Sequence, residues 1–385
     1  MQRTSISLIA ALVGVFCAGC NGGSSSAVWP GPSCAPSTLQ EQPITAPPSS
    51  AASPIDVSSP NGIIVFAIGD PSSTAGQLGV AWPDGSHLAP LSAAATNGFA
   101  VSPDGQWVVF GTAGGPRLVR TDGTNEHALS VGTMNADTFA WAPNSQYIAF
   151  HGWNPTNPGV EGIYEIALGG CEPLNVSAKG GEKDLPIAIS PADGSILADG
   201  GVQLSNGKLD VGTIVIDRPG DRSRTLIDPS GSISLVQPGA GAPAAFSPDG
   251  RHLAFTAATA TPATFSAAAN GIFLADANGG NVETIVSGGV ASGIAWSTDG
   301  QWIATTRIDD SGTPQVWYVK SDGSTATFLT RFQEPGACCP VWSPDSSAVL
   351  TWGGAIIPLQ GASASQIAAA SGATPYDYAW VKPAP

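Results

Sequence analysis

Short apolar runs separated by turn residues recur through residues 62–385 of the chain. The recurring unit is one apolar residue, then Ser-Pro-Asp-Gly or a close variant, two variable positions and a second apolar run. Copies begin at Val101, Trp141, Ile189, Phe246, Trp296 and Trp342, and a truncated copy begins at Trp380. Successive copies start between 38 and 57 residues apart, a period typical of repeat architectures. Because the runs are short and bounded by Gly, Pro, Asp and Asn, they predict strands.

A second hairpin pattern follows most copies of this unit. It starts at Arg117, Gly162, Gly212, Gly271 and Gln315. Its turns, such as Thr-Asp-Gly, Ala-Asn-Gly and Ser-Asp-Gly, contain residues that tolerate the positive φ of tight hairpin turns. Each unit is therefore expected to form four strands. A repeating four-stranded unit of this length is typical of a β-propeller blade.

The two ends of the repeat region complement each other. The runs from Gly62 and Gln77 supply three strands of a blade that lacks its first strand, and the run from Tyr378 supplies a first strand alone. We therefore predict an all-β propeller over residues 61–385 with seven four-stranded blades, closed by pairing of the C-terminal strand with the N-terminal blade. Six or eight blades would also fit, because the step from Ile189 to Phe246 is long enough for additional strands.

Composition narrows the function classes. The 385 residues include 48 Gly and 33 Pro, which argues against a helical bundle because both residues break helix interiors. Lys and Arg total 14 against 29 Asp and Glu, so the formal net charge is −15. A chain of this charge would repel a phosphate backbone, and we expect no nucleic-acid partner.

The N-terminal residues match a bacterial export signal. Arg3 precedes the apolar run Ile6–Phe16, which is shorter than the about 20 residues that a membrane-spanning helix needs. Ala18-Gly19-Cys20 then resembles a lipobox, so residues 1–19 are expected to be cleaved and Cys20 to be lipidated. An ordinary secretory signal with a chance cysteine is the alternative.

The residues after Cys20 refine the expected location. The resemblance to lipoproteins and Asn21 at the following position imply the periplasmic side of the outer membrane, with contact to the membrane through the lipid alone. Residues 20–60 are rich in Ser, Pro, Ala and Gly, and they predict a tether between the lipid and the propeller.

The repeated (Trp/Phe)-Ser-Pro-Asp-Gly-x-x-(Ile/Val/Leu)-Ala-Phe copies resemble the WD40-like propeller repeats of the TolB family, the periplasmic component of the Tol-Pal system. The resemblance covers residues 62–385 and implies the fold and an envelope location. It does not imply a TolB function, because TolB has an α/β domain before a six-bladed propeller and has no lipobox.

Several repeated residues are expected to be structural. The carboxylates at Asp104, Asp249, Asp299 and Asp345 lie in turns, where they can bond nearby backbone N–H groups. The aromatic residues that begin the copies are expected to wedge between neighbouring blades.

Four cysteines are candidates for disulfide bonds in an oxidising compartment: Cys34, Cys171, Cys338 and Cys339. They admit three pairings into two bridges, and the sequence does not choose among them. No His lies in metal-ligand spacing with them, so we expect no metal or cofactor.

Loops between blades, and between the second and third strands, gather on one face of a propeller. The candidate binding residues in them are His151, Trp153, Glu161, Glu182, Asp184, Arg307, Asp309, Asp310, Arg331 and Glu334. Their mixed charge suits a protein or a glycan, although solvated loop tips without a partner would show the same composition.

Signals for catalysis are sparse. The sequence has no Gly-x-Ser-x-Gly elbow, and His151 is the one histidine in a candidate binding loop, with Glu161 and Asp309 as potential partners. We therefore expect a monomeric, non-catalytic scaffold that binds an envelope protein or glycan. The alternative is a propeller enzyme, a lyase or hydrolase, that acts on a glycan.

Overall fold

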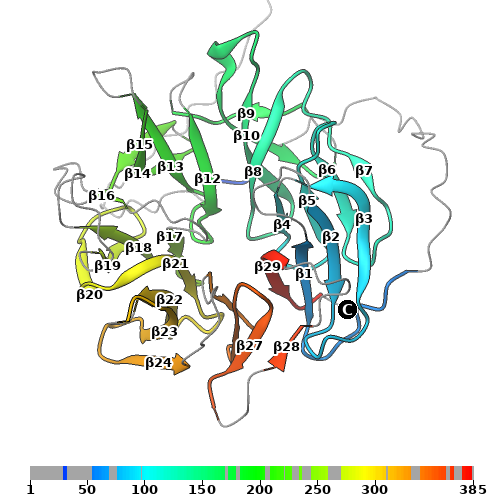
Figure 1. The fold of residues 1–385 in the computed structure, drawn as a ribbon. Coiled ribbons are helices and arrows are strands. Elements are labelled where there is room, and N and C mark those ends of the chain that lie inside the picture. The colour runs from blue at the N-terminus through cyan, green and yellow to red at the C-terminus, as the bar shows by residue number, and fades with distance from the viewer. Residues whose placement is uncertain are drawn as a thin grey trace, which may run out of the picture.

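The computed structural model describes residues 29–32, 54–68, 76–96, 98–169, 172–178, 183–203, 209–220, 222–227, 234–235, 244–258, 270–308, 311–330, 339–360, 365–367 and 375–383. These residues form seven antiparallel sheets arranged around a central axis (Figure 1). We number the sheets as blades 1 to 7 in chain order and give their strands from the innermost outwards.

The first four blades each have four strands. Blade 1 contains β29 (Pro375–Val381), β1 (Ile63–Ile68), β2 (Gly76–Ala81) and β3 (Ala89–Thr96). Blade 2 contains β4 (Phe99–Val101), β5 (Trp107–Phe110), β6 (Arg117–Arg120) and β7 (His127–Ala128). Blade 3 contains β8 (Asn135–Trp141), β9 (Tyr147–Trp153), β10 (Gly162–Ala167) and β11 (Leu174–Asn175). Blade 4 contains β12 (Asp184–Ile189), β13 (Ile196–Gln203), β14 (Leu209–Arg218) and β15 (Ser223–Leu226).

The last three blades follow the same plan. Blade 5 contains β16 (Ser234–Leu235), β17 (Ala244–Phe246), β18 (His252–Ala258), β19 (Asn270–Asp276) and β20 (Glu283–Val286). Blade 6 contains β21 (Val290–Trp296), β22 (Trp302–Ile308), β23 (Pro314–Lys320) and β24 (Ala326–Thr330). Blade 7 contains β25 (Val341–Trp342), β26 (Ala348–Leu350), β27 (Ala355–Pro358) and β28 (Ser365–Gln366).

The ring closes as the sequence predicts. β29 pairs antiparallel with β1, and Val381 lies opposite Ile63 while Tyr378 lies opposite Phe66. The innermost strands also contact one another in sequence around the axis, and β25 contacts β29, which contacts β4. The seven-bladed, all-β propeller and its closure by the C-terminal strand are therefore confirmed.

The long step between Ile189 and Phe246 holds no additional blade. It contains the long hairpin of β13 and β14, which have 8 and 10 residues. It also contains an inner strand in two pieces, because β16 and β17 both pair with β18. The extra length thus extends blades 4 and 5, and the alternatives of six or eight blades are excluded.

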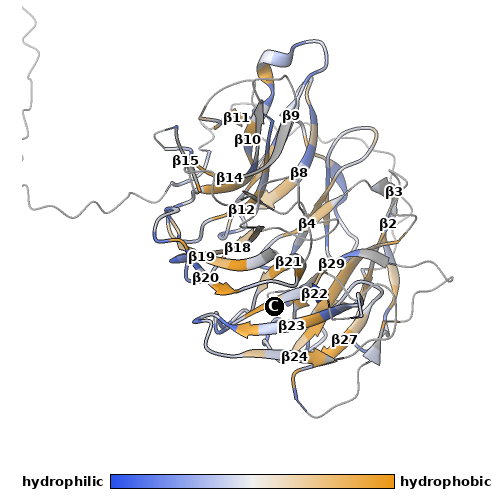
Figure 2. Ribbon diagram, turned by 60° about the vertical axis from the view of Figure 1, so that its left-hand side comes forward, coloured by the Kyte–Doolittle hydropathy of each residue, from blue (hydrophilic) through white to orange (hydrophobic). Residues whose placement is uncertain are grey.

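Apolar residues of neighbouring blades form the core. One cluster joins Leu197 and Ile216 of blade 4 to Phe246, Leu253 and Phe255 of blade 5. A blade presents apolar side chains on both faces of its sheet, so each blade can bury them only against its neighbours. Figure 2 shows the hydrophobic strands stacked side by side around the axis.

The aromatic residues that begin five of the copies wedge between blades, as predicted. The indole N–H groups of Trp141, Trp296 and Trp342 donate to the main-chain oxygens of Ala100, Ala245 and Ala295 on the preceding inner strand. These bonds satisfy the polar edge of each indole within an otherwise apolar interface.

The Asp residues of the Ser-Pro-Asp-Gly turns have the expected structural role. Asp104 accepts hydrogen bonds from the Ser102 hydroxyl and the Gln106 main-chain N–H, and the other three copies repeat this arrangement. Gly105, at φ +70°, takes the left-handed conformation that the turn requires.

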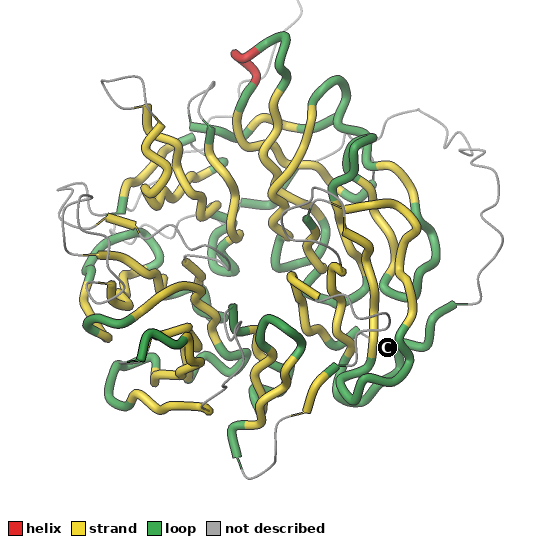
Figure 3. The backbone as a smooth tube through the Cα atoms, viewed as in Figure 1, coloured by secondary structure: helices red, strands yellow, loops and turns green. Residues whose placement is uncertain are grey.

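Helical structure in the described residues is confined to the short 3-10 turn η1 (Pro158–Val160), between β9 and β10 (Figure 3). No helix that could cross a bilayer is present in the described part of the chain.

Two stretches of the expected tether pack on the ring. Trp29 packs against the apolar cluster shared by blades 3 and 4. Ile55 and Val57 pack against the cluster shared by blades 1 and 2. The composition of residues 20–60 did not predict these contacts.

Candidate functional site

The two faces of the ring carry different loops. Each inner strand begins at one face, which we call the entry face, and ends at the other, which we call the turn face because the Ser-Pro-Asp-Gly turns lie there. The connection between the second and third strands of a blade returns to the entry face. The described parts of the loops predicted to bind a partner therefore lie on the entry face.

A cluster of three polar side chains forms on the entry face of blade 3. The imidazole of His151, on β9, lies between the carboxylates of Asp137, on β8, and Glu161, just before β10. Its Nδ1 is 2.8 Å from an oxygen of Asp137, and its Nε2 is 3.3 Å from an oxygen of Glu161. The His151 side chain is only 3% exposed, whereas those of Asp137 and Glu161 are 41% and 28% exposed. The histidine is thus enclosed, and the two carboxylates form the accessible edge of the cluster.

A β-bulge in the inner strand places Asp137 in this cluster. Asp137 lies opposite His151, but the next paired residue is Phe139, opposite Phe150. The extra residue is Thr138, at φ +50°, a conformation that is rare for a β-branched residue. Bulges of this kind redirect side chains, and they are frequent beside functional sites.

Trp153 extends the cluster with an aromatic surface. Its ring stacks on that of His151 at a centroid distance of 5.0 Å and an angle of 13°. Trp153 is half-buried, so the residue retains some exposure to solvent. The loop that follows is held by Asn154, whose side chain bonds Thr156 and also reaches the main-chain oxygen of Thr133 on the adjoining loop.

The geometry of this cluster suits binding. Both ring nitrogens of His151 face carboxylates, so neither nitrogen is directed at a substrate. The exposed oxygens of Asp137 and Glu161 can accept hydrogen bonds from hydroxyl, amide or ammonium groups. Trp153 adds a flat apolar surface beside them. Among the described residues, no group of three or more His, Cys, Asp or Glu is arranged to hold a metal ion.

Arg307 occupies a separate position on the entry face of blade 6. Its guanidinium lies 4.6 Å from the ring centroid of Trp317 and donates to the main-chain oxygen of Gly288. A side chain at Gly289 would crowd this guanidinium, because an added Cβ would lie 3.1 Å from it, and Gly289 has φ +76°. Blade 6 is three blades from blade 3, so the structure does not bring Arg307 into the His151 cluster.

The other predicted residues have different placements. Asp184 begins β12 in blade 4 and is fully buried, so its side chain is not presented at the surface. Cys339 is disulfide-bonded, and its main-chain N–H donates to the Thr306 hydroxyl on β22. Cys20, Cys34, Cys171, Cys338, Glu182, Asp309, Asp310, Arg331 and Glu334 lie outside the described residues, and their roles remain predictions.

Two features of the structure were not predicted from the sequence. The first is Asp137, because the bulge at Thr138 breaks the alternation from which its direction would be read. The second is a buried pair on the turn face, in which the Trp29 indole N–H donates to a carboxylate oxygen of Glu165 at 2.8 Å. Glu165 could have been noticed as a carboxylate within the apolar run GIYEIAL. Its partner Trp29 lies in residues 20–60, which were expected to form a tether.

Comparisons with known proteins support the fold. The sequence matches no protein-family model and no curated protein. Among solved structures, a TolB from Acinetobacter baumannii has 16% identity and a TM-score of 0.45, and the match covers 69% of this chain and 62% of that chain. An oligogalacturonate lyase in complex with manganese has 11% identity and a TM-score of 0.54, over 76% of this chain and 88% of that one.

Peptidases share the fold as well. A prolyl endopeptidase has 14% identity and a TM-score of 0.53, and the match covers 82% of this chain but only 49% of that chain. At these identities the comparisons show the architecture alone. The chain is therefore a seven-bladed β-propeller whose fold is shared by an oligogalacturonate lyase and by part of a prolyl endopeptidase.

Proposed function

We propose that the protein is a lipid-anchored β-propeller of the bacterial cell envelope that binds a protein or a glycan as a non-catalytic scaffold. The observation that carries this proposal is the enclosure of His151 between Asp137 and Glu161, beside the half-buried ring of Trp153. This arrangement presents acceptors and an aromatic surface but directs no ring nitrogen outwards.

The lipobox-like residues at Ala18-Gly19-Cys20 support the location. The structure supports a scaffold role because every inner strand among the described residues is paired once β29 closes the ring, and a closed ring holds its loops in fixed positions.

The test compares two stacked aromatic pairs on opposite faces. Trp153 stacks on His151 at the entry face, and Trp82 stacks on His87 at the turn face, with a centroid distance of 3.9 Å and an angle of 14°. We expect Trp153→Ala to abolish capture of the partner from envelope extracts by the immobilised protein, and Trp82→Ala to leave capture unchanged. Capture is followed by mass spectrometry for proteins and by glycan analysis.

Two outcomes would contradict the scaffold proposal. One is equal recovery of every bound species by wild type and Trp153→Ala. The other is enzymatic turnover of a glycan. A glycan-degrading enzyme is the second candidate function, because carboxylates flank His151 and a lyase shares the fold. Degradation of an oligosaccharide by the purified protein, lost in His151→Gln, would identify an enzyme instead.

A further inference from the structure

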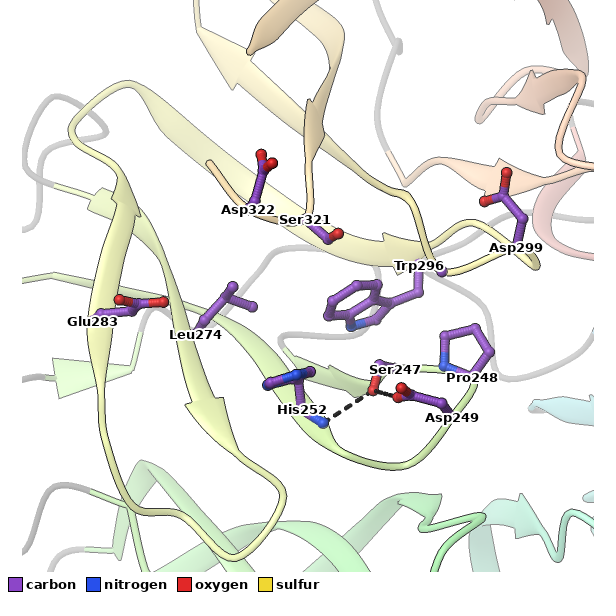
Figure 4. A pocket seen from close by; sticks show the side chains of 11 residues that line it. Ser247, Pro248, Asp249, His252, Leu274, Glu283, Trp296, Asp299, Ser321 and Asp322 are labelled. Carbon is purple, nitrogen blue, oxygen red and sulfur yellow. Dashed lines mark hydrogen bonds between the residues drawn. The ribbon is translucent and has the colours of Figure 1, made fainter. Parts of the chain in front are cut away.

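A hollow of about 500 Å³ opens on the turn face between blades 5 and 6. We call it the blade 5–6 groove. Figure 4 shows Trp296 and Leu274 in its middle, with Glu283 and Asp299 on opposite sides. The His151 cluster lies on the entry face, so this groove is separate from the site proposed above.

Two other grooves of the ring are already filled by the N-terminal residues of the same chain. Between blades 3 and 4, the indole of Trp29 bonds Glu165, and its main-chain N–H donates to the main-chain oxygen of Asp193. Between blades 1 and 2, Ile55 packs on the shared apolar cluster, and its main-chain N–H donates to the main-chain oxygen of Asp122. In both grooves an N-terminal segment inserts an apolar side chain, and its main-chain N–H bonds a turn of the second blade.

Strand register shows that the blade 5–6 groove is the counterpart of the groove that holds Trp29. Tyr147 begins the second strand of blade 3, and His252 begins the second strand of blade 5. The main-chain oxygen of each accepts a hydrogen bond from the main-chain N–H of the residue five positions earlier. Glu165 and Leu274 occupy the same place on the third strand, because they pair with Ala149 and Ala254, two residues further along the second strand.

The second blade of each pair matches as well. A side chain at Gly194 or at Gly220 would meet Trp29. Their counterparts in blade 6 are Gly300, in the turn after the inner strand, and Asp322, in the turn after the third strand, and both line the blade 5–6 groove.

The chemistry of the blade 5–6 groove combines an apolar floor with an acidic rim. Leu274 is 7% exposed and Trp296 is partly buried, whereas Glu283, Asp299 and Asp322 are exposed at the rim. Hydrogen bonds from Ser324 hold the pKa of Asp322 below its usual value, so this carboxylate is ionised at neutral pH.

Further charges lie near the rim. Asp249 lines the groove too, but the Arg251 guanidinium lies 3.9 Å from its carboxylate and offsets part of its charge. Lys320 lies over the Trp302 ring, and its charge also acts on Asp322. The carboxylates of Asp249, Glu283, Asp299 and Asp322 outnumber these two cations, so the rim is negative.

We propose that the blade 5–6 groove binds an extended segment of a partner protein that inserts an aromatic side chain beside Leu274 and Trp296 and carries Lys or Arg opposite the acidic rim. The main-chain carbonyl of Asp299 is the counterpart of the Asp193 carbonyl that accepts from Trp29. It is the expected acceptor for the main-chain N–H of the inserted residue.

The N-terminal residues that flank the two docked segments do not supply such a segment. Residues 20–28 and 33–53 contain no aromatic residue and no Lys or Arg. A second copy could offer its own Trp29, but no cation lies anywhere between residues 20 and 60 to meet the acidic rim. Charge complementarity therefore favours a different, basic partner.

The test uses the purified protein and the labelled peptide Lys-Trp-Pro-Gly-Pro-Lys, which combines the sequence around Trp29 with flanking cations. Binding is measured by fluorescence anisotropy at low ionic strength. We expect saturable binding that is at least about tenfold weaker for Glu283→Lys/Asp322→Lys.

The matched control reverses two acidic residues elsewhere. Asp84 occupies in blade 1 the turn position that Asp322 occupies in blade 6, and its carboxylate accepts from Ser86 as that of Asp322 accepts from Ser324. Glu172 is exposed on blade 3. The double variant Asp84→Lys/Glu172→Lys changes the net charge equally, and we expect it to keep most of the affinity.

Peptide variants test the same proposal without altering the protein. Replacement of Trp by Ala in the peptide should abolish binding, and replacement of both Lys by Glu should weaken it at least about tenfold. The proposal is overturned by absence of saturable binding, by equal affinity for the Ala peptide, or by equal weakening in the two double variants. Thermal melts of all variants confirm that the fold is retained.

Discussion

At the scale of single residues, the most unusual group is the buried carboxylate of Glu165. The residue is fully buried, and one of its oxygens has no hydrogen-bond partner among the described residues. Burial raises the pKa of Glu165 to about 7, and the hydrogen bond from Trp29 opposes that rise. Docking of the N-terminal segment on blades 3 and 4 is therefore coupled to the protonation of this carboxyl group.

The coupling predicts a stability that falls as pH rises. The pKa of Glu165 is higher in the folded than in the unfolded chain, so the folded chain binds more protons between about pH 4.5 and 7. The stabilisation is fully present below pH 4.5 and is lost as pH rises to about 7. Glu165→Gln removes this titration and keeps an acceptor for Trp29. The free energy of unfolding of the variant relative to wild type should rise by about 3 kcal/mol between pH 4.5 and 8.

Urea denaturation of both proteins at several pH values measures this difference, and titrations common to the two proteins cancel. A difference that does not change with pH would show that Glu165 has an ordinary pKa.

At the scale of elements, β29 is the strand that completes both its blade and the ring. It supplies the inner strand of blade 1, and Trp380 buries its ring while donating to the main-chain oxygen of Asn61. Without β29, β1 would expose an unpaired edge and the inner strands of blades 7 and 2 would lose a shared neighbour.

Removal of residues 375–385 should therefore abolish cooperative folding. The lost pairing and the exposed cores of blades 1 and 7 would cost an amount comparable to the about 5–15 kcal/mol that stabilises a typical domain. Circular dichroism melts and size-exclusion chromatography measure the effect. Removal of residues 384–385 alone is the control, because all of β29 remains. A single sharp melt at the wild-type temperature in the longer truncation would refute the role of β29.

At the scale of the whole molecule, the described N-terminal residues contact the turn face. Trp29 docks there only nine residues after Cys20, so a lipid on Cys20 would hold the turn face within about 30 Å of the membrane. The entry face, with the His151 cluster, would then point away from the lipid.

The proposed lipid anchor can be tested in the native host. Cys20→Ala removes the acylated thiol, and we expect the variant to move from the membrane fraction to the soluble envelope fraction because no other lipid attachment is proposed. Fractionation followed by immunoblotting measures the distribution, and Cys17→Ala is the control. Retention of Cys20→Ala in the membrane fraction would show that attachment does not depend on lipidation.

Much of the architecture could be predicted from the chain, whereas the site could be predicted only in part. The aromatic wedges, the Asp turns and the pairing of β29 with β1 each depend on a repeated local pattern, so they are visible in the sequence. His151 and Glu161 were expected in one loop region, and they do meet. Asp137 was not expected, because the direction of its side chain depends on one extra residue in a bulge.

Periodicity and turn chemistry thus predict the four-stranded blade, the order of the blades and their closure, since these features repeat along the chain. The choice of seven blades over six or eight needed the structure, because the long step between Ile189 and Phe246 extends two blades and adds none. The repeated pattern does not specify which grooves between blades are filled. Trp29 fills the groove between blades 3 and 4, where it lies beside Glu165, 136 residues away in the sequence. The corresponding blade 5–6 groove is open. Such contacts join segments that are distant in the chain and depend on the shape and charge of surfaces that exist only once the blades have packed. A local sequence pattern does not predict such long-range contacts. Only the tertiary structure therefore determines which groove is filled and which side chains meet around His151.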